Sequence, residues 1–141
     1  MLKQMAHTGI VVDDLDAAIG FFTALGLELE GTGTVEGKAV DQVNGLRGVR
    51  GDIAMLRTEG GVIELCQYRT PETLDGDAGA PPNTLGLRHI GFEVDSLDGA
   101  LDRLRPHGAE LVGEVAQYED SWRLCYVRGP VGVIVELAQR L

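Results

Sequence analysis

The chain has 141 residues, 22 of them acidic and 12 basic, so its formal charge is −10 at neutral pH. Hydrophobic residues make up 44% of the sequence, which suits one folded domain and excludes an acidic disordered chain. The surplus of acidic residues also argues against binding to nucleic acid or to an anionic membrane surface, because like charges repel.

The first half of the chain predicts one strand, one helix and three further strands. Asp13 and Asp14 follow a short apolar run and are typical of the start of a helix. Apolar residues then recur at helical spacing until Gly26, which ends the predicted helix. We expect a strand at 9–12, a helix at 15–25, and strands at 27–34, 52–58 and 62–68, with a hairpin turn at 59–61 and a long loop at 35–51 that has one helical turn near 40–44.

The second half predicts the same order of elements. We expect a strand at 87–94, a helix at 96–106, and strands near 110–117, 122–128 and 131–138, with the last hairpin at Gly129-Pro130. Between the halves, residues 69–86 contain three prolines and three glycines and are predicted to be a linker. We therefore expect one domain over residues 1–141, with module one at about 5–68 and module two at about 87–139.

The two halves are copies of one unit. His7–Leu29 aligns without gaps with His89–Leu111, and 10 of the 23 positions are identical. A second similarity follows in each half, because Val62–Leu65 resembles Ile134–Leu137. The sequence therefore predicts an α+β fold of two tandem βαβββ modules. Glycine accounts for 20 residues, about twice its usual ~7%, as expected for many turns and close approaches of the backbone.

Four polar residues occupy equivalent positions in the two copies. Because strand side chains alternate between faces, His7 and His89 are expected opposite the apolar face of the first strand of each module. Glu64 and Glu136 are expected on the corresponding face of the last strands. A carboxylate within an apolar strand is costly unless it is paired or coordinated, and symmetric packing of the copies would bring all four residues together. Two imidazoles and two carboxylates suit a divalent metal such as Zn, Ni, Co, Mn or Fe.

These segments resemble the vicinal oxygen chelate superfamily, also called the glyoxalase/bleomycin resistance protein/dioxygenase family. The resemblance rests on HTGIVVDDLDAAIGFF, GGVIEL, HIGFEVDSLDGAL and GPVGVIVEL and covers His7 to about Gln139. It implies that the two modules form a partly open β-barrel around a metal. By motif position the implied metal ligands are His7, Glu64, His89 and Glu136.

The resemblance also implies an activity. The four-ligand set is nearest to the glyoxalase I and methylmalonyl-CoA epimerase branches, which implies isomerase, epimerase or lyase chemistry through a metal-stabilised enolate, with Glu64 or Glu136 as the catalytic base. The arginines that glyoxalase I uses for glutathione carboxylates have no clear match, and residues 126–130 lack the lysine of the acyl-CoA epimerases. The alternatives are an extradiol-type dioxygenase, which uses two histidines and one glutamate, and a ligand-sequestering protein of the antibiotic-resistance type.

Other residues are secondary candidates. Arg47 and Arg50 in the predicted loop, and Arg123 or Tyr126 in the strand before the last hairpin, are placed to meet a substrate. Trp122 is expected in the core, Cys66 as a small buried filler, His107 as a structural residue at a helix end, and Asp13 and Asp95 as helix caps.

The expected partners are a small-molecule substrate and a second copy in a homodimer. Two cysteines and no apolar N-terminal or membrane-spanning run indicate a cytoplasmic protein.

Overall fold

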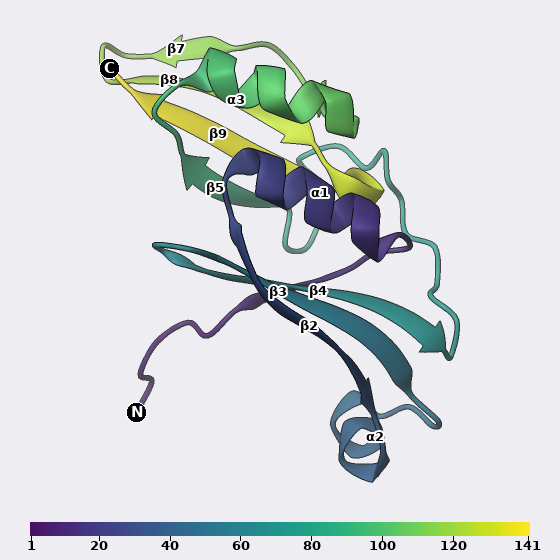
Figure 1. Ribbon diagram of the computed structural model, residues 1–141. Helices are drawn as coiled ribbons and strands as arrows, with labels where there is room; N and C mark the ends of the chain where they lie inside the picture. Colours follow the sequence, from purple (N-terminus) through teal and green to yellow (C-terminus); the bar gives the residue numbers. More distant parts are fainter. The chain divides into compact units, whose positions relative to one another are not determined.

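The computed structural model describes all of residues 1–141, which divide into two compact units, Met1–Asp75 and Gly76–Leu141 (Figure 1). Each unit holds one open sheet, and the order of its main elements is βαβββ. The predicted α+β architecture of two tandem modules is therefore confirmed. The division between the units lies within the segment 69–86 that was predicted to link the modules.

The first unit has a four-stranded sheet in the order β1-β4-β3-β2. Strand β1 runs parallel to β4, whereas the β4–β3 and β3–β2 pairs are antiparallel. The elements are β1 (Thr8–Val11), α1 (Leu15–Leu25), β2 (Glu28–Glu36), α2 (Lys38–Asn44), β3 (Arg50–Thr58) and β4 (Gly61–Thr70).

The core of the first unit lies between α1 and one face of this sheet. Helix α1 buries four side chains at helical spacing: Ala18, Phe21, Phe22 and Leu25. Side chains from β3 and β4 complete the core, because alternate residues of those strands face the helix: Ala54, Leu56, Ile63 and Leu65. The opposite face of β1 and β4 is therefore left for His7, Glu64 and their neighbours.

The predicted loop at 35–51 is much shorter in the structure. Strand β2 continues to Glu36, and α2 follows at Lys38–Asn44, beyond the ends of β2 and β3 (Figure 1). No residue of α2 is buried, so the helix has no apolar periodicity from which its length could be predicted. Strand β4 also runs to Thr70, two residues into the predicted linker.

The second unit has a sheet in the order β5-β9-β8-β6, with β7 also paired to β8. Strands β5 and β9 are parallel, as β1 and β4 are in the first unit. The elements are β5 (His89–Glu93), α3 (Leu97–Leu104), the 3-10 helix η1 (Arg105–His107), β6 (Glu110–Leu111), β7 (Ala116–Tyr118), β8 (Trp122–Arg128), the 3-10 helix η2 (Pro130–Gly132) and β9 (Ile134–Arg140).

The core of this unit repeats the first. Helix α3 buries Leu97, Ala100, Leu101 and Leu104, and β8 and β9 contribute Cys125, Val127, Val135 and Leu137. Two predictions were less accurate here. The single strand expected at 110–117 is divided into β6 and β7, which lie at the exposed edge of β8. The last connection is η2 rather than a tight hairpin.

The two helices start in the same way. Asp14, one of the two aspartates expected to cap α1, does so through its side chain, and Ser96 caps α3. Asp13 and Asp95 were also expected to be caps, but each lies one residue before the cap. A glutamine from the last strand of each module also contacts the first turn. The side-chain oxygen of Gln67 accepts the Leu15 N–H at 3.0 Å, and that of Gln139 accepts the Leu97 N–H at 2.8 Å.

Arginine side chains hold the segment between the modules to the second unit. The Arg128 guanidinium donates to the backbone carbonyls of Ala78, Gly79 and Ala80 at 2.9–3.2 Å. Arg88 donates to the carbonyls of Ala80 and Pro81 at 3.0 and 3.1 Å. Residues 78–81, part of the predicted linker, are therefore fixed to the end of β8 by Arg128 and to the start of β5 by Arg88.

The longest helix, α1, has 11 residues, and no helix in the structure is long and apolar enough to cross a membrane.

Candidate functional site

In the first unit, His7 and Glu64 lie side by side on neighbouring strands. Glu64 is paired in register with Gly9 across the parallel β1–β4 ladder, and His7 precedes β1. His7 Nε2 is 3.6 Å from Glu64 Oε2. Both side chains are partly exposed, at 42% and 30%, on the sheet face opposite α1. Gly9, the register partner of Glu64 on β1, has no side chain to cover the carboxylate.

The second unit repeats this pair. Glu136 is paired in register with Gly91 across the β5–β9 ladder, and His89 begins β5. His89 Nε2 is 3.9 Å from Glu136 Oε2, and the side chains are 41% and 30% exposed. The strand pairing, the nitrogen that faces the carboxylate and the exposure are therefore nearly the same in both units. A single such pair would be an ordinary ion pair of little energetic weight.

The donor atoms of each pair fit a shared cation. Two ligands bound to one Zn²⁺-like ion at about 2.0–2.2 Å lie about 3.0–3.5 Å apart. The observed distances of 3.6 and 3.9 Å lie just above this range. Imidazole nitrogen and carboxylate oxygen are also donors that borderline divalent metals accept.

Each unit brings together two of the four predicted ligands. No group of three or more His, Cys, Asp or Glu side chains in the structure is close enough to hold a metal ion. The predicted convergence of all four residues therefore stays a prediction. What is observed is one histidine–glutamate pair in each unit, and each pair is called a half-site below.

Of the secondary candidates, Tyr126 lies beside a half-site. It is paired in register with Glu136, and its hydroxyl is 3.5 Å from His89 Nδ1. Arg123 points to the face of the second sheet that is opposite Tyr126. There its guanidinium makes two hydrogen bonds, of 3.0 and 3.3 Å, to Asp98 of α3. Arg50 lies 3.9 Å from Glu36, and Arg47 is exposed after α2.

Two other predicted positions differ. Trp122 was expected in the core, but it is half-buried at the start of β8 with the Arg140 guanidinium 4.3 Å from its ring centroid. Cys66 follows Glu64 by two residues on the same strand face and is only partly buried. Partial burial, together with the nearby Glu64 carboxylate, raises the pKa of the Cys66 thiol.

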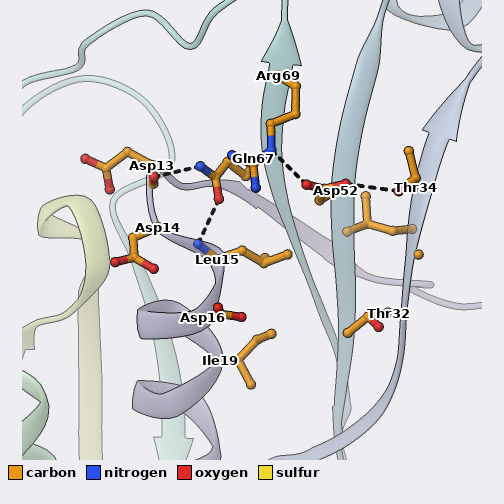
Figure 2. A pocket seen from close by; sticks show the side chains of 12 residues that line it. Asp13, Asp14, Leu15, Asp16, Ile19, Thr32, Thr34, Asp52, Gln67 and Arg69 are labelled. Carbon is orange, nitrogen blue, oxygen red and sulfur yellow. Dashed lines mark hydrogen bonds and ion pairs between the residues drawn. The ribbon is translucent and has the colours of Figure 1, made fainter.

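A pocket of about 530 Å³ lies on the other face of the first sheet, beside the start of α1 (Figure 2). Gln67 spans its wall by bonding both Leu15 N–H and the Asp13 carbonyl, and Asp52 accepts from Arg69 and Thr34. The hydrogen bonds from Arg69 and Thr34 lower the pKa of Asp52. The pocket is separate from His7 and Glu64, which lie on the opposite face.

The second unit has a different side chain at the position equivalent to Asp52. Asp52 is the register partner of Gln67, and Arg123 is the register partner of Gln139, so Asp52 and Arg123 are equivalent. In the second unit Arg123 reaches across to Asp98 in the first turn of α3. The first unit has a short acidic side chain at that position, and Asp52 turns instead to Arg69.

Sequence reasoning missed Gln67, Gln139 and Arg128. Each glutamine follows its predicted ligand by three residues, Glu64–Gln67 and Glu136–Gln139, and this repeated spacing was a usable signal. Arg128 binds backbone carbonyls of a distant segment, and no sequence pattern indicates such a contact.

Comparison with known proteins agrees with this fold. Residues 6–126 match the family model described as the glyoxalase/bleomycin resistance protein/dioxygenase superfamily, and the chain therefore belongs to that superfamily. A crystal structure of a glyoxalase family protein from Bacillus cereus is similar, with 45% identity, a TM-score of 0.95, and coverage of 100% of this chain and 96% of that one.

More distant matches also extend over nearly the whole chain. The uncharacterized protein YwbC of Bacillus subtilis is 28% identical over 145 residues, covering 99% of this chain and 100% of that protein. A glyoxylase/bleomycin resistance protein/dioxygenase domain from Frankia is 22% identical with a TM-score of 0.65, covering 100% of this chain and 94% of that one. The superfamily contains many enzymes, and membership by itself assigns no reaction.

Proposed function

We propose that this chain is a divalent-metal-dependent enzyme that isomerises, epimerises or cleaves a small carbonyl substrate. The observation that carries the proposal is the repetition of one histidine–glutamate pair, at 3.6 Å in one unit and 3.9 Å in the other, on equivalent strands. Both copies of the repeat have kept this pair, although they agree at only 10 of the 23 positions over His7–Leu29. Membership of the superfamily supports the same reading.

The proposed ligands are His7, Glu64, His89 and Glu136, supplied by one chain or by two copies of it. Each histidine uses Nε2, the nitrogen that already faces its glutamate. A divalent cation, if held by these residues, would polarise the substrate carbonyl and make the neighbouring C–H more acidic.

The glutamates have a second role in this proposal. A carboxylate next to the substrate accepts the proton from carbon and returns it at the product position, so that the substrate gains and loses no atoms in an isomerisation. Glu64 and Glu136 are each about 30% exposed, so their oxygens are accessible to a substrate on that face of the sheet. Gly9 and Gly91, their register partners, leave room beside them.

The first test is metal content and affinity. Tag-free protein is analysed for bound metals, stripped with a chelator, and titrated with Zn²⁺, Ni²⁺, Co²⁺, Mn²⁺ and Fe²⁺. We expect tight binding of at least one ion, weakened at least about 10-fold by Glu64→Gln or Glu136→Gln. Glu28→Gln, on the exposed strand β2, is the matched control and should bind like the wild type. Absence of binding to every ion would end the proposal.

The second test is the reaction. The loaded protein is assayed with a hemithioacetal of an α-oxoaldehyde, with acyl-CoA epimers and with a catechol. Proton exchange or turnover with either of the first two, lost in both glutamate variants, supports the proposal. Iron-dependent oxygen uptake with the catechol that survives Glu64→Gln but not His7→Ala would replace it with a dioxygenase. Ligand binding that survives Glu136→Ala, without turnover, would indicate a sequestering protein.

A further inference from the structure

The two half-sites differ at one position. On the strand next to each glutamate, the register partner of Glu64 is Met55, whereas that of Glu136 is Tyr126. The Tyr126 hydroxyl lies 3.5 Å from His89 Nδ1, and the two rings are 4.9 Å apart at an interplanar angle of 35°. Met55 has no group that could make the same contact with His7.

Both ring nitrogens of His89 therefore have neighbours. Nε2 faces the Glu136 carboxylate at 3.9 Å, and Nδ1 faces the tyrosine hydroxyl. A carboxylate accepts only, so it favours a proton on Nε2, while a phenol hydroxyl both donates and accepts. A neutral imidazole carries one proton, and the partner of one nitrogen decides what the other can bind.

We propose that Tyr126 is a positioning residue that holds the His89 ring through a hydrogen bond at Nδ1 in either tautomer. In the metal-free protein, Nε2–H faces Glu136 and Nδ1 accepts from the Tyr126 O–H. If Nε2 were to bind a divalent cation, its proton would leave, one proton would be taken up at Nδ1, and Nδ1 would donate to the Tyr126 oxygen. The ring has one proton before and after, and the hydroxyl only reverses its direction. His7 has no such partner.

This inference rests on the proposed function, because the second state requires metal binding. The contact between Tyr126 and His89 orients the histidine of the second half-site for metal binding, whereas His7 in the first half-site has no such contact. Hydrogen-bonding partners behind a metal ligand typically contribute 10- to 100-fold in affinity. We therefore expect Tyr126→Phe to weaken Zn²⁺ binding about 10-fold or more. Tyr118→Phe, on the exposed strand β7, is the matched control and should leave the affinity unchanged.

The readout that separates positioning from a merely structural effect is the histidine ring itself. Two-bond ¹H–¹⁵N spectra, recorded at a pH about two units above the ordinary imidazole pKa of ~6.5, distinguish protonated from unprotonated ring nitrogens. In the wild type we expect His89 to be protonated at Nε2 without zinc and at Nδ1 with it. In Tyr126→Phe the Nδ1 signal of the metal-free protein should move to that of a free acceptor, while the His7 signals stay unchanged.

Three results would overturn the inference. They are a His89 ring already protonated at Nδ1 in the metal-free protein, identical His89 signals in the wild type and Tyr126→Phe, and Zn²⁺ affinity unaffected by Tyr126→Phe. Failure of the proposed function is a different outcome: if the wild type binds no zinc, the metal site is wrong, yet the metal-free spectra still decide whether Tyr126 holds Nδ1.

Discussion

Arg123 and Asp98 form two parallel hydrogen bonds that link β8 to the first turn of α3. These bonds lower the pKa of the Asp98 carboxyl, because the guanidinium stabilises its ionised form. A carboxyl whose pKa is lower in the folded state contributes stability above its ordinary pKa. That contribution disappears as the pH falls through the folded-state pKa.

Asp98→Asn should therefore destabilise the protein at neutral pH and have less effect in acid. We expect its urea midpoint to lie below that of the wild type at a pH of about 7, and the gap to close as the pH falls below the ordinary carboxyl pKa of ~3.9. Exposed Asp75, replaced by Asn, is the control and should show no such gap. A gap that is the same at both ends of the titration contradicts this assignment.

Strand alternation was sufficient to predict which residues share the face of each glutamate. It placed His7 with Glu64 and His89 with Glu136, and it separated Arg123 from Tyr126. It could not say which of these last two lies beside the histidine, because that depends on the register between β8 and β9. Contacts between residues far apart in sequence, such as Gln67 with Leu15, were missed for the same reason.

Two glutamines join the last strand of each module to the start of its first long helix. Gln67 bonds both the N–H of Leu15 and the carbonyl of Asp13, so it fastens the start of α1 to β4. Gln139 bonds only the N–H of Leu97 at the start of α3.

Gln67→Leu should cost more stability than Gln139→Leu. Each variant leaves one partly buried N–H unpaired, which costs about 1–3 kcal/mol. Gln67→Leu also removes the exposed bond to the Asp13 carbonyl, which contributes about 0.5–1.5 kcal/mol. Urea unfolding measures both values, with Gln42→Leu on the exposed helix α2 as the control. Equal losses for the two variants would show that the bond to Asp13 contributes nothing.

The connection between β8 and β9 depends on one glycine. Gly132 has a φ of +80°, and a Cβ there would collide with the backbone carbonyl of Ala78. We expect Gly132→Ala to lower the free energy of unfolding by more than about 2 kcal/mol, through left-handed strain and the collision together. Gly113→Ala, which meets open space, should change it little. Similar unfolding midpoints for the two variants would contradict the collision.

At the scale of the whole molecule, the repeat was the strongest signal in the sequence. It predicted two modules with the same order of elements, because an apolar helix face and alternating strands recur 82 residues apart. Elements without a buried face were predicted poorly. Helix α2 and the edge strands β6 and β7 have no buried residues, so no hydrophobic pattern marks their limits.

Metal binding, if it occurs as proposed, must also stabilise the fold. A ligand that binds only the folded state at 100 times its Kd adds about 2.7 kcal/mol, which for a chain of this size raises the Tm by roughly 5–15 °C. Thermal unfolding with Zn²⁺ and with a chelator should show this difference in the wild type and in Glu28→Gln. The double variant Glu64→Gln, Glu136→Gln should unfold at the same temperature under both conditions.

Arg128 recognises residues 78–80 through their backbone carbonyls and touches none of their side chains by hydrogen bonds. The identity of exposed residues 78 and 79 is therefore free to drift during evolution, provided that the backbone keeps its path past Gly132, whereas Ala80 is buried and must stay small. For protein engineering, positions 78 and 79 tolerate a change of side chain but not a change of length. A peptide tag or label is better attached through a substituted side chain at 78 or 79 than inserted between them.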